Sequence, residues 1–313
     1  MDIWPLYLFH AGAQTLNAAI SLRARAWIEA RPDERVELVS EDIDQQQNLS
    51  FDQLPDDQTL PLLAKLAHRF GARGIRLTTR GESPAGAGIA GSSALNVAIC
   101  GALAAYTKQE FDGEALLEIA KDVEAQVIGV PTGLQDYRPA YYGGISAVEL
   151  HPGGPIRVPL QVDPHELERR IVLCYTGEPR NSGTNNWEIT KRHIDGDQHV
   201  FDCFERIRDT AATMRDALTR GDWDATARCL ATEWQNRKRL APGVSTPAID
   251  SLIARAMASG ATAAKVCVAG GGGCLFCLVP PGDAAAVRES LADGGASVLD
   301  FSIEATGLDV TRE

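Results

Sequence analysis

The sequence predicts an α+β protein with two domains. Its 313 residues, 44% of them hydrophobic, suffice for one large or two ordinary domains. Segments with strand periodicity are interspersed with segments of helical periodicity, and proline and charged residues gather between Val158 and Glu168, which indicates a boundary there. We therefore expect an N-terminal domain over residues 1–165 and a C-terminal domain over residues 166–313.

In the N-terminal half, alternating polarity indicates strands and longer apolar periodicity indicates helices. The acidic, glutamine-rich segment between Ser40 and Pro61 is typical of a solvated loop. Glycine and proline break the helical pattern after residue 128, and we expect a hairpin that turns at Gly143–Gly144. The expected strands are residues 16–26, 36–40 and 74–79, and the expected helices are residues 60–70, 92–108 and 114–128.

In the C-terminal half, two strand-like runs flank four consecutive glycines, Gly270 to Gly273. Ordered glycines cost backbone entropy, so they favour a place where backbone or ligand approaches closely; a flexible turn is the alternative. The other expected strands are residues 171–175 and 296–303, and the expected helices are residues 187–220, 223–240, 247–259 and 284–293.

Composition narrows the class of partner. A net charge of -12 and a pI near 5.0 argue against nucleic acid and membrane surfaces, which attract basic patches. Seven cysteines, several within apolar runs, indicate buried free thiols in a reducing cytoplasm. Cys274 and Cys277 have CxxC spacing, but no second pair accompanies them, so a buried strand is favoured over a metal site.

The stretch from Gly81 to Tyr106 is a small-residue loop that leads into an apolar helix, an arrangement that favours phosphate binding. Gly86, Gly88 and Gly91 fit the dinucleotide pattern GxGxxG, but the second strand that this motif requires is missing. A P-loop would need lysine where Ser92 stands. An ordinary serine-capped turn is the remaining alternative.

Two carboxylates are candidates for phosphoryl-transfer chemistry. Asp136 follows the broken helix end and is expected to project from irregular backbone, and Glu124 lies twelve residues earlier near the end of the preceding helix. A carboxylate that accepts a hydroxyl proton and another that binds a hard cation are what transfer to an alcohol needs. Ordinary surface charge is the alternative.

These features together resemble one superfamily. Pro84–Ala94 is similar to the Pro-x-x-x-Gly-Leu-Gly-Ser-Ser loop of the galactokinase, homoserine kinase, mevalonate kinase and phosphomevalonate kinase (GHMP) superfamily, and Lys265–Gly273 is similar to its glycine-rich C-terminal motif. Glu124 and Asp136 match its magnesium glutamate and catalytic aspartate. Within the superfamily, the chain most resembles the D-glycero-D-manno-heptose 7-phosphate kinase branch. The segments that carry this resemblance are residues 133–137, 142–144, 175–180 and 233–238.

The resemblance implies an ATP-loop domain packed on a ferredoxin-like domain, and transfer from ATP, with Mg²⁺, to a hydroxyl of a sugar or sugar phosphate. It makes Asp136 the catalytic base and gives Ser93 and Glu124 to the metal. The nucleotide residues that it implies are Pro84, Gly86, Gly88, Ala90, Gly91, Ser92 and Ser93. The substrate residues that it implies are Asp2, Gly133, Gln135, Arg180, Gly271 and Gly272.

One motif is incomplete. Asp2 stands at the aspartate of the family's first, sugar-contacting motif, whose strand and basic residue we expect upstream of Met1. Two alternatives therefore remain open: a kinase of another sugar or small alcohol, and a nucleotide-binding member that is inactive without the first motif. A small-molecule partner, a homodimer and a cytoplasmic location complete the expectations.

Overall fold

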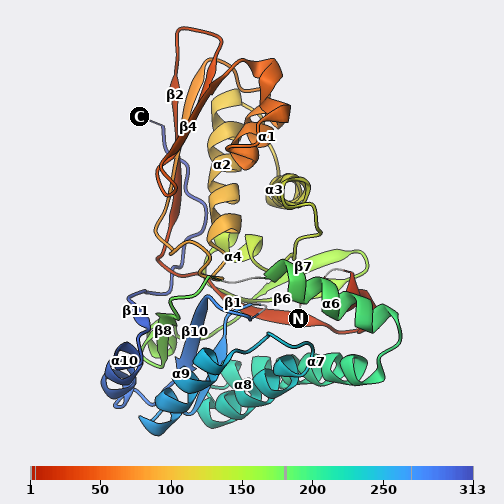
Figure 1. Cartoon of the computed structure of the whole chain (residues 1–313), viewed down its shortest axis with the longest axis vertical. Helices are drawn as coiled ribbons and strands as arrows, with labels where there is room; N and C mark the ends of the chain where they lie inside the picture. The colour runs from red at the N-terminus through yellow and green to blue at the C-terminus, as the bar shows by residue number, and fades with distance from the viewer. Residues whose placement is uncertain (1, 4, 180–181, 269, 313) are drawn as a thin grey trace. The chain divides into compact units, whose positions relative to one another are not determined.

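The computed structural model describes residues 2–3, 5–179, 182–268 and 270–312, which form two compact units (Figure 1). The first unit comprises Met1–Ser21, Gly86–Ile89 and Gly144–Ala305, and the second comprises Leu22–Ala85, Ala90–Gly143 and Thr306–Glu313. Each unit is thus assembled from segments that are distant in sequence. The mixture of helices and sheets confirms the α+β class, whereas the domain boundary at residue 165 stays a prediction.

A four-stranded sheet forms the base of the second unit. Its strands are β2 (Ala24–Ala30), β5 (Ile75–Gly81), β3 (Val36–Ser40) and β4 (Gln45–Leu49), in that spatial order. β5 runs antiparallel to β2 and parallel to β3, and β4 returns antiparallel to β3. Leu38 and Leu77 are fully buried on one face, because alternate side chains of a strand point to the same side.

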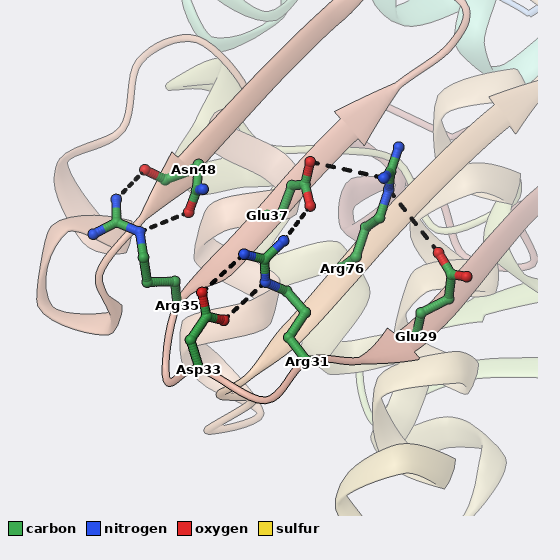
Figure 2. Close-up of polar contacts among 7 residues, drawn as sticks. All are labelled: Glu29, Arg31, Asp33, Arg35, Glu37, Asn48 and Arg76. Atoms are coloured by element: carbon green, nitrogen blue, oxygen red, sulfur yellow. Dashed lines mark hydrogen bonds and ion pairs between the residues drawn. The ribbon is translucent and has the colours of Figure 1, made fainter.

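The other face of this sheet carries charged side chains in register. Arg76 stands opposite both Glu29 and Glu37. Its guanidinium lies 4.0 Å from Glu29 Oε2 and 3.9 Å from Glu37 Oε1 (Figure 2). Arg31 pairs with Glu37 and with Asp33, the latter at 2.9 Å. Partly exposed pairs of this kind contribute little stability each, so the network marks the face that water reaches.

The helices of the second unit cover the apolar face of the sheet. α2 lies against it in Figure 1, α1 packs on α2, and α3 packs on both helices. Ile99 and Leu103 of α2 are fully buried, and the Asp112 side chain caps α3 by accepting from the Ala115 N–H. These elements are η2 (Phe51–Asp56), α1 (Pro61–Arg69), α2 (Gly91–Thr107), α3 (Gly113–Ile128) and α4 (Tyr137–Tyr142).

Two antiparallel sheets form the first unit. One has the order β1 (Gln14–Ala18), β6 (Ile145–His151), β7 (Gly154–Pro159), and the other has the order β11 (Ser297–Leu299), β8 (Ile171–Tyr175), β10 (Cys274–Leu278), β9 (Ala263–Val266). Leu275 and Phe204 belong to one core that the second sheet shares with its helices. The helices of this unit are η1 (Leu6–Phe9), α5 (Pro164–Glu168), α6 (Ser182–Ile194), α7 (Gln198–Thr219), α8 (Trp223–Lys238), α9 (Pro247–Ala258) and α10 (Ala284–Asp293).

The fold corrects several expectations. The segment expected as a loop between Ser40 and Pro61 contains β4 and η2, because its glutamines pair in an edge strand with β3. No hairpin turns at Gly143–Gly144: α4 ends at Gly143, whose φ is 69°, and β6 pairs instead with β7 beyond the turn at 152–153. The expected helix 187–220 is two helices separated at Gly196, whose φ is 82°. The strand expected over residues 16–26 is β1 and the start of β2.

The prediction of buried free thiols is confirmed, and so is the buried strand at Cys274 and Cys277. All seven cysteines are free, six are buried, and Cys274 and Cys277 lie in β10. Burial raises the pKa of both thiols, so neither is poised to ionise. Among the described residues, no group of three or more His, Cys, Asp or Glu is arranged to hold a metal, and no helix is long and apolar enough to cross a membrane.

Candidate active site

The glycine-rich loop leads directly into α2. Gly86 and Gly88 have φ of 70° and 67°, backbone that a side chain would strain. Ala90 occupies the N-cap position of α2 with φ 66° and supplies no side-chain cap. A Cβ added at Gly91 would collide with the Ser83 hydroxyl, which would have to rotate away. The first turn of α2 therefore has no side-chain cap for its N–H groups, which is the arrangement that suits an anion.

The carboxylate of Glu124, near the end of α3, is surrounded by hydrogen-bond donors. Ser92 donates its hydroxyl to Glu124 Oε1 at 3.0 Å, and Tyr137 donates its hydroxyl to Glu124 Oε2 at 2.5 Å. The Asn96 side-chain amide lies 3.5 Å from Oε2 and donates to the Ala120 carbonyl at 2.6 Å. Glu124 is 9% exposed, so these donors hold a nearly buried carboxylate in one orientation.

Tyr137 stays protonated under ordinary conditions. Burial raises the pKa of its phenol, and the neighbouring Glu124 carboxylate raises it further. The hydroxyl therefore remains a donor to Glu124, and the nearby Ser93 side chain acts on its pKa in the opposite direction. Ser93 is 5% exposed, whereas Ser92 is exposed.

Asp136 lies at the N-cap position of α4, where irregular backbone ends, as the broken pattern predicted. It is half-buried, like Gly133 and Gln135 in the same loop. Arg138, 1% exposed, donates to the Leu134 carbonyl at 2.9 Å and fixes the loop to α4. The loop between α3 and α4 is thus held by its own neighbours.

In the first unit, the glycine-rich C-terminal segment packs against backbone. The Cys274 N–H donates to the Ala87 carbonyl at 2.6 Å, and a Cβ at Gly273 would lie 2.5 Å from the same oxygen. A Cβ at Gly272 would lie 2.8 Å from the Pro179 carbonyl. The Gly271 N–H donates to the Val244 carbonyl at 2.9 Å. Gly272 and Gly273 therefore permit close approach of backbone, which is one of the two interpretations of the four glycines.

Three of the predicted site residues lie close together in the second unit. Within the second unit, the structure brings Ser92, Ser93 and Glu124 together around Tyr137. Asp2 is half-buried in the first unit. Arg180 lies outside the described residues.

Sequence reasoning missed Tyr137 and Asn96. Tyr137 directly follows Asp136, which draws attention to its position, but its partner becomes visible only when α4 packs on α3. Asn96 lies four residues after Ser92, so both face the same neighbour on a helix, and that spacing was an available signal.

Solved structures of similar proteins share the fold. The crystal structure of a D-glycero-D-manno-heptose 1-phosphate kinase from Bacteroides thetaiotaomicron matches with a TM-score of 0.80 and 25% identity over 99% of this chain and 94% of that one. The Lactococcus lactis galactokinase, solved with galactose, matches with a TM-score of 0.79 and 18% identity over 98% of this chain and 92% of that one. The architecture is therefore that of small-molecule kinases.

Sequence comparison gives the family. The D-glycero-alpha-D-manno-heptose 7-phosphate kinase of Campylobacter jejuni is 27% identical over 98% of this chain and 93% of its own length. A mevalonate kinase of Archaeoglobus fulgidus is 27% identical over 71% of this chain and 73% of its own length. Models of the GHMP kinases N-terminal domain and the GHMP kinases C-terminal domain match residues 59–144 and 214–297, together more than half of the chain.

The chain belongs to the GHMP kinase family. The family resemblance, the kinase class and the two-domain fold predicted from the sequence are confirmed, and ATP is accordingly the phosphoryl donor.

Proposed function

We propose that this protein transfers a phosphoryl group from ATP to a hydroxyl of a sugar phosphate of the heptose phosphate type. The observation that carries the proposal is the Ser92–Glu124 contact at the uncapped start of α2, because it joins the glycine-rich loop to a buried carboxylate. The similarity over 98% of the chain to a heptose 7-phosphate kinase supports this substrate class.

The donor set fits Mg²⁺. Glu124 and the two serine hydroxyls are hard oxygen ligands, the kind that this cation prefers. Ser93 and Glu124 would hold the metal, which when bound would neutralise charge on the phosphates. The backbone around Gly86, Gly88 and Gly91 would contact the phosphates, with the neighbouring Pro84, Ala90 and Ser92 shaping the loop.

Asp136 would accept the proton of the substrate hydroxyl, since it stands at the end of a loop held firmly by α4. The residues that would contact the substrate are Asp2, Gly133, Gln135 and Arg180. Gly271 and Gly272 would shape the loop that approaches the reacting groups. A cytoplasmic location, a homodimer and the domain boundary at residue 165 are further predictions.

The test is a phosphotransfer screen. Purified protein with Mg-ATP is offered D-glycero-D-manno-heptose 7-phosphate, the corresponding 1-phosphate, hexose phosphates, free hexoses and mevalonate. We expect acceptor-dependent ADP release to be highest with a heptose phosphate, and ³¹P NMR of the product to identify the phosphorylated hydroxyl.

Two outcomes would contradict the proposal. Preferential turnover of mevalonate or of a free hexose would favour another substrate within the family, a candidate that the mevalonate kinase relatives support. ATP binding by calorimetry without turnover of any acceptor would favour a nucleotide-binding protein without catalysis.

A further inference from the structure

One phenol connects three parts of the second unit. Tyr137 begins α4, Glu124 lies near the end of α3, and Ser93 lies in the first turn of α2. The Tyr137 hydroxyl donates to Glu124 Oε2 at 2.5 Å, and the Ser93 side chain of α2 lies near it. The hydroxyl thus lies between the two residues that the proposed function gives to the metal.

The two oxygens of the Glu124 carboxylate have different surroundings. Oε2 faces Tyr137 and Asn96, which are both buried, whereas Oε1 accepts from Ser92, which is exposed. A carboxylate whose inner oxygen is held by a fixed donor keeps its outer oxygen in one direction. Supporting hydrogen bonds of this kind orient metal ligands in many proteins.

Two other polar contacts of α4 reach the opposite end of α3. Arg138 pairs with Glu114, and the Tyr142 hydroxyl donates to Glu114 Oε1 at 3.0 Å. Glu114 and Glu124 are ten residues apart, or about 15 Å along the helix axis. Tyr137, by contrast, reaches the Glu124 end of α3, next to Asp136.

We propose that Tyr137 is a positioning residue, whose hydroxyl orients the Glu124 carboxylate and Ser93 toward the divalent cation and fixes the start of α4, which carries Asp136. This inference rests on the proposed function, because it takes Glu124 and Ser93 as the residues that hold the metal. Tyr137 itself would touch neither the metal nor the substrate.

The experiment compares Tyr137→Phe with Tyr142→Phe. Both substitutions keep the ring and remove one hydroxyl that donates to a carboxylate of α3. Binding of Mn²⁺ to the protein saturated with a non-hydrolysable ATP analogue is measured without acceptor, by electron paramagnetic resonance of the free ion. Thermal unfolding of the metal-free protein reports whether each variant is folded.

We expect Tyr137→Phe to weaken Mn²⁺ binding roughly 10–100-fold while unfolding cooperatively, and Tyr142→Phe to leave the affinity unchanged. The Mg²⁺ concentration that gives half-maximal turnover should rise in Tyr137→Phe and stay unchanged in Tyr142→Phe. Equal Mn²⁺ affinity in Tyr137→Phe and wild type, or equal losses in both variants, would overturn the inference.

A third variant separates this inference from the proposed function. Glu124→Gln should lose Mn²⁺ binding more completely than Tyr137→Phe. If Glu124→Gln binds Mn²⁺ normally, the metal is held elsewhere and both proposals fail. If the variants behave as expected but no heptose phosphate is phosphorylated, the substrate proposal fails while the role of Tyr137 stands.

Discussion

Lys265 Nζ lies 2.8 Å from Glu233 Oε2 between β9 and α8, with side chains 12% and 10% exposed. Arg237 donates to the other oxygen of Glu233 at 2.5 Å. One carboxylate thus neutralises a buried lysine at the start of the glycine-rich C-terminal segment. Charges removed from water in this way are costly unless they remain paired.

We expect Glu233→Met to lower the free energy of unfolding by roughly 3–5 kcal/mol, because it leaves the buried Lys265 ammonium without its carboxylate partner. Urea unfolding followed by circular dichroism measures the loss. Lys238→Met is the control, since the Lys238–Asp250 pair at 3.5 Å is more exposed and should contribute less than about 1 kcal/mol. Similar losses in the two variants would contradict a special role for the buried pair.

The free energy of unfolding should decrease at low pH, because protonation of Glu233 removes its ion pairs. Burial raises the pKa of this carboxyl, but Arg237 and Lys265 outweigh that effect and lower it to about 2. The stabilisation is therefore complete above the pKa of the unfolded state and is lost as the pH falls from that value toward 2. It is on the order of 3 kcal/mol.

The measurement is the urea midpoint between pH 6 and pH 3 for wild type and Glu233→Gln. The variant should be less stable at pH 6 and should show a shallower decline. Parallel curves for the two proteins would show that Glu233 does not cause the acid sensitivity.

Asp136→Asn tests the proposed base. We expect kcat to fall roughly 10²–10⁴-fold, with ATP affinity by calorimetry nearly unchanged, because the amide cannot accept the proton. Asp122→Asn on the exposed surface of α3 is the matched control and should retain full activity. Near-normal turnover by Asp136→Asn would place the base elsewhere.

Gly88→Val tests the phosphate loop. A β-branched residue at φ 67° is strained by about 1–3 kcal/mol, and its side chain would stand where phosphate must approach the backbone. We expect ATP affinity to fall about 10-fold or more, the equivalent of about 1.4 kcal/mol. Gly196→Val introduces comparable strain in the turn before α7, where a Cβ meets no other atom, and should leave ATP affinity unchanged.

Val268 carries backbone strain within the glycine-rich C-terminal segment. Its φ is 51°, a left-handed conformation that a β-branched residue rarely adopts. We expect Val268→Gly to raise the unfolding free energy by about 1 kcal/mol, because the relief of strain exceeds the added entropy of the unfolded chain. Val266→Gly, in β9 with ordinary backbone, should instead destabilise the protein; a loss of stability in Val268→Gly would mean that the valine side chain matters more than the strain.

Local patterns predicted the elements whose own residues determine them. α2 follows from a long apolar run after small residues, and α3 follows from its apolar periodicity and its end at Gly129, whose φ is 70°. β4 could not be predicted in this way, because glutamines have weak strand preference and form a strand here by pairing with β3.

The site residues that lie in local sequence motifs could also be predicted, whereas those that depend on packing could not. Glu124 and the serines of α2 were found because the chain places them in motifs, and the structure joins Ser92 to Glu124 directly. Tyr137 was not found, because its importance depends on the packing of α4 against α3 and not on its neighbours in sequence. The backbone that Gly273 contacts, at Ala87, is separated from it by most of the chain and could not be inferred from either motif.

The last residues of the chain complete the second unit. The Leu308 N–H donates to the Tyr141 carbonyl at 3.0 Å, and Leu308 and Val310 pack against Gly101 of α2. During synthesis on the ribosome, α2 therefore emerges about two hundred residues before the side chains that cover it. The surface of α2 around Gly101 therefore stays uncovered until Leu308 and Val310 have been synthesised, so this unit cannot reach its final packing before then.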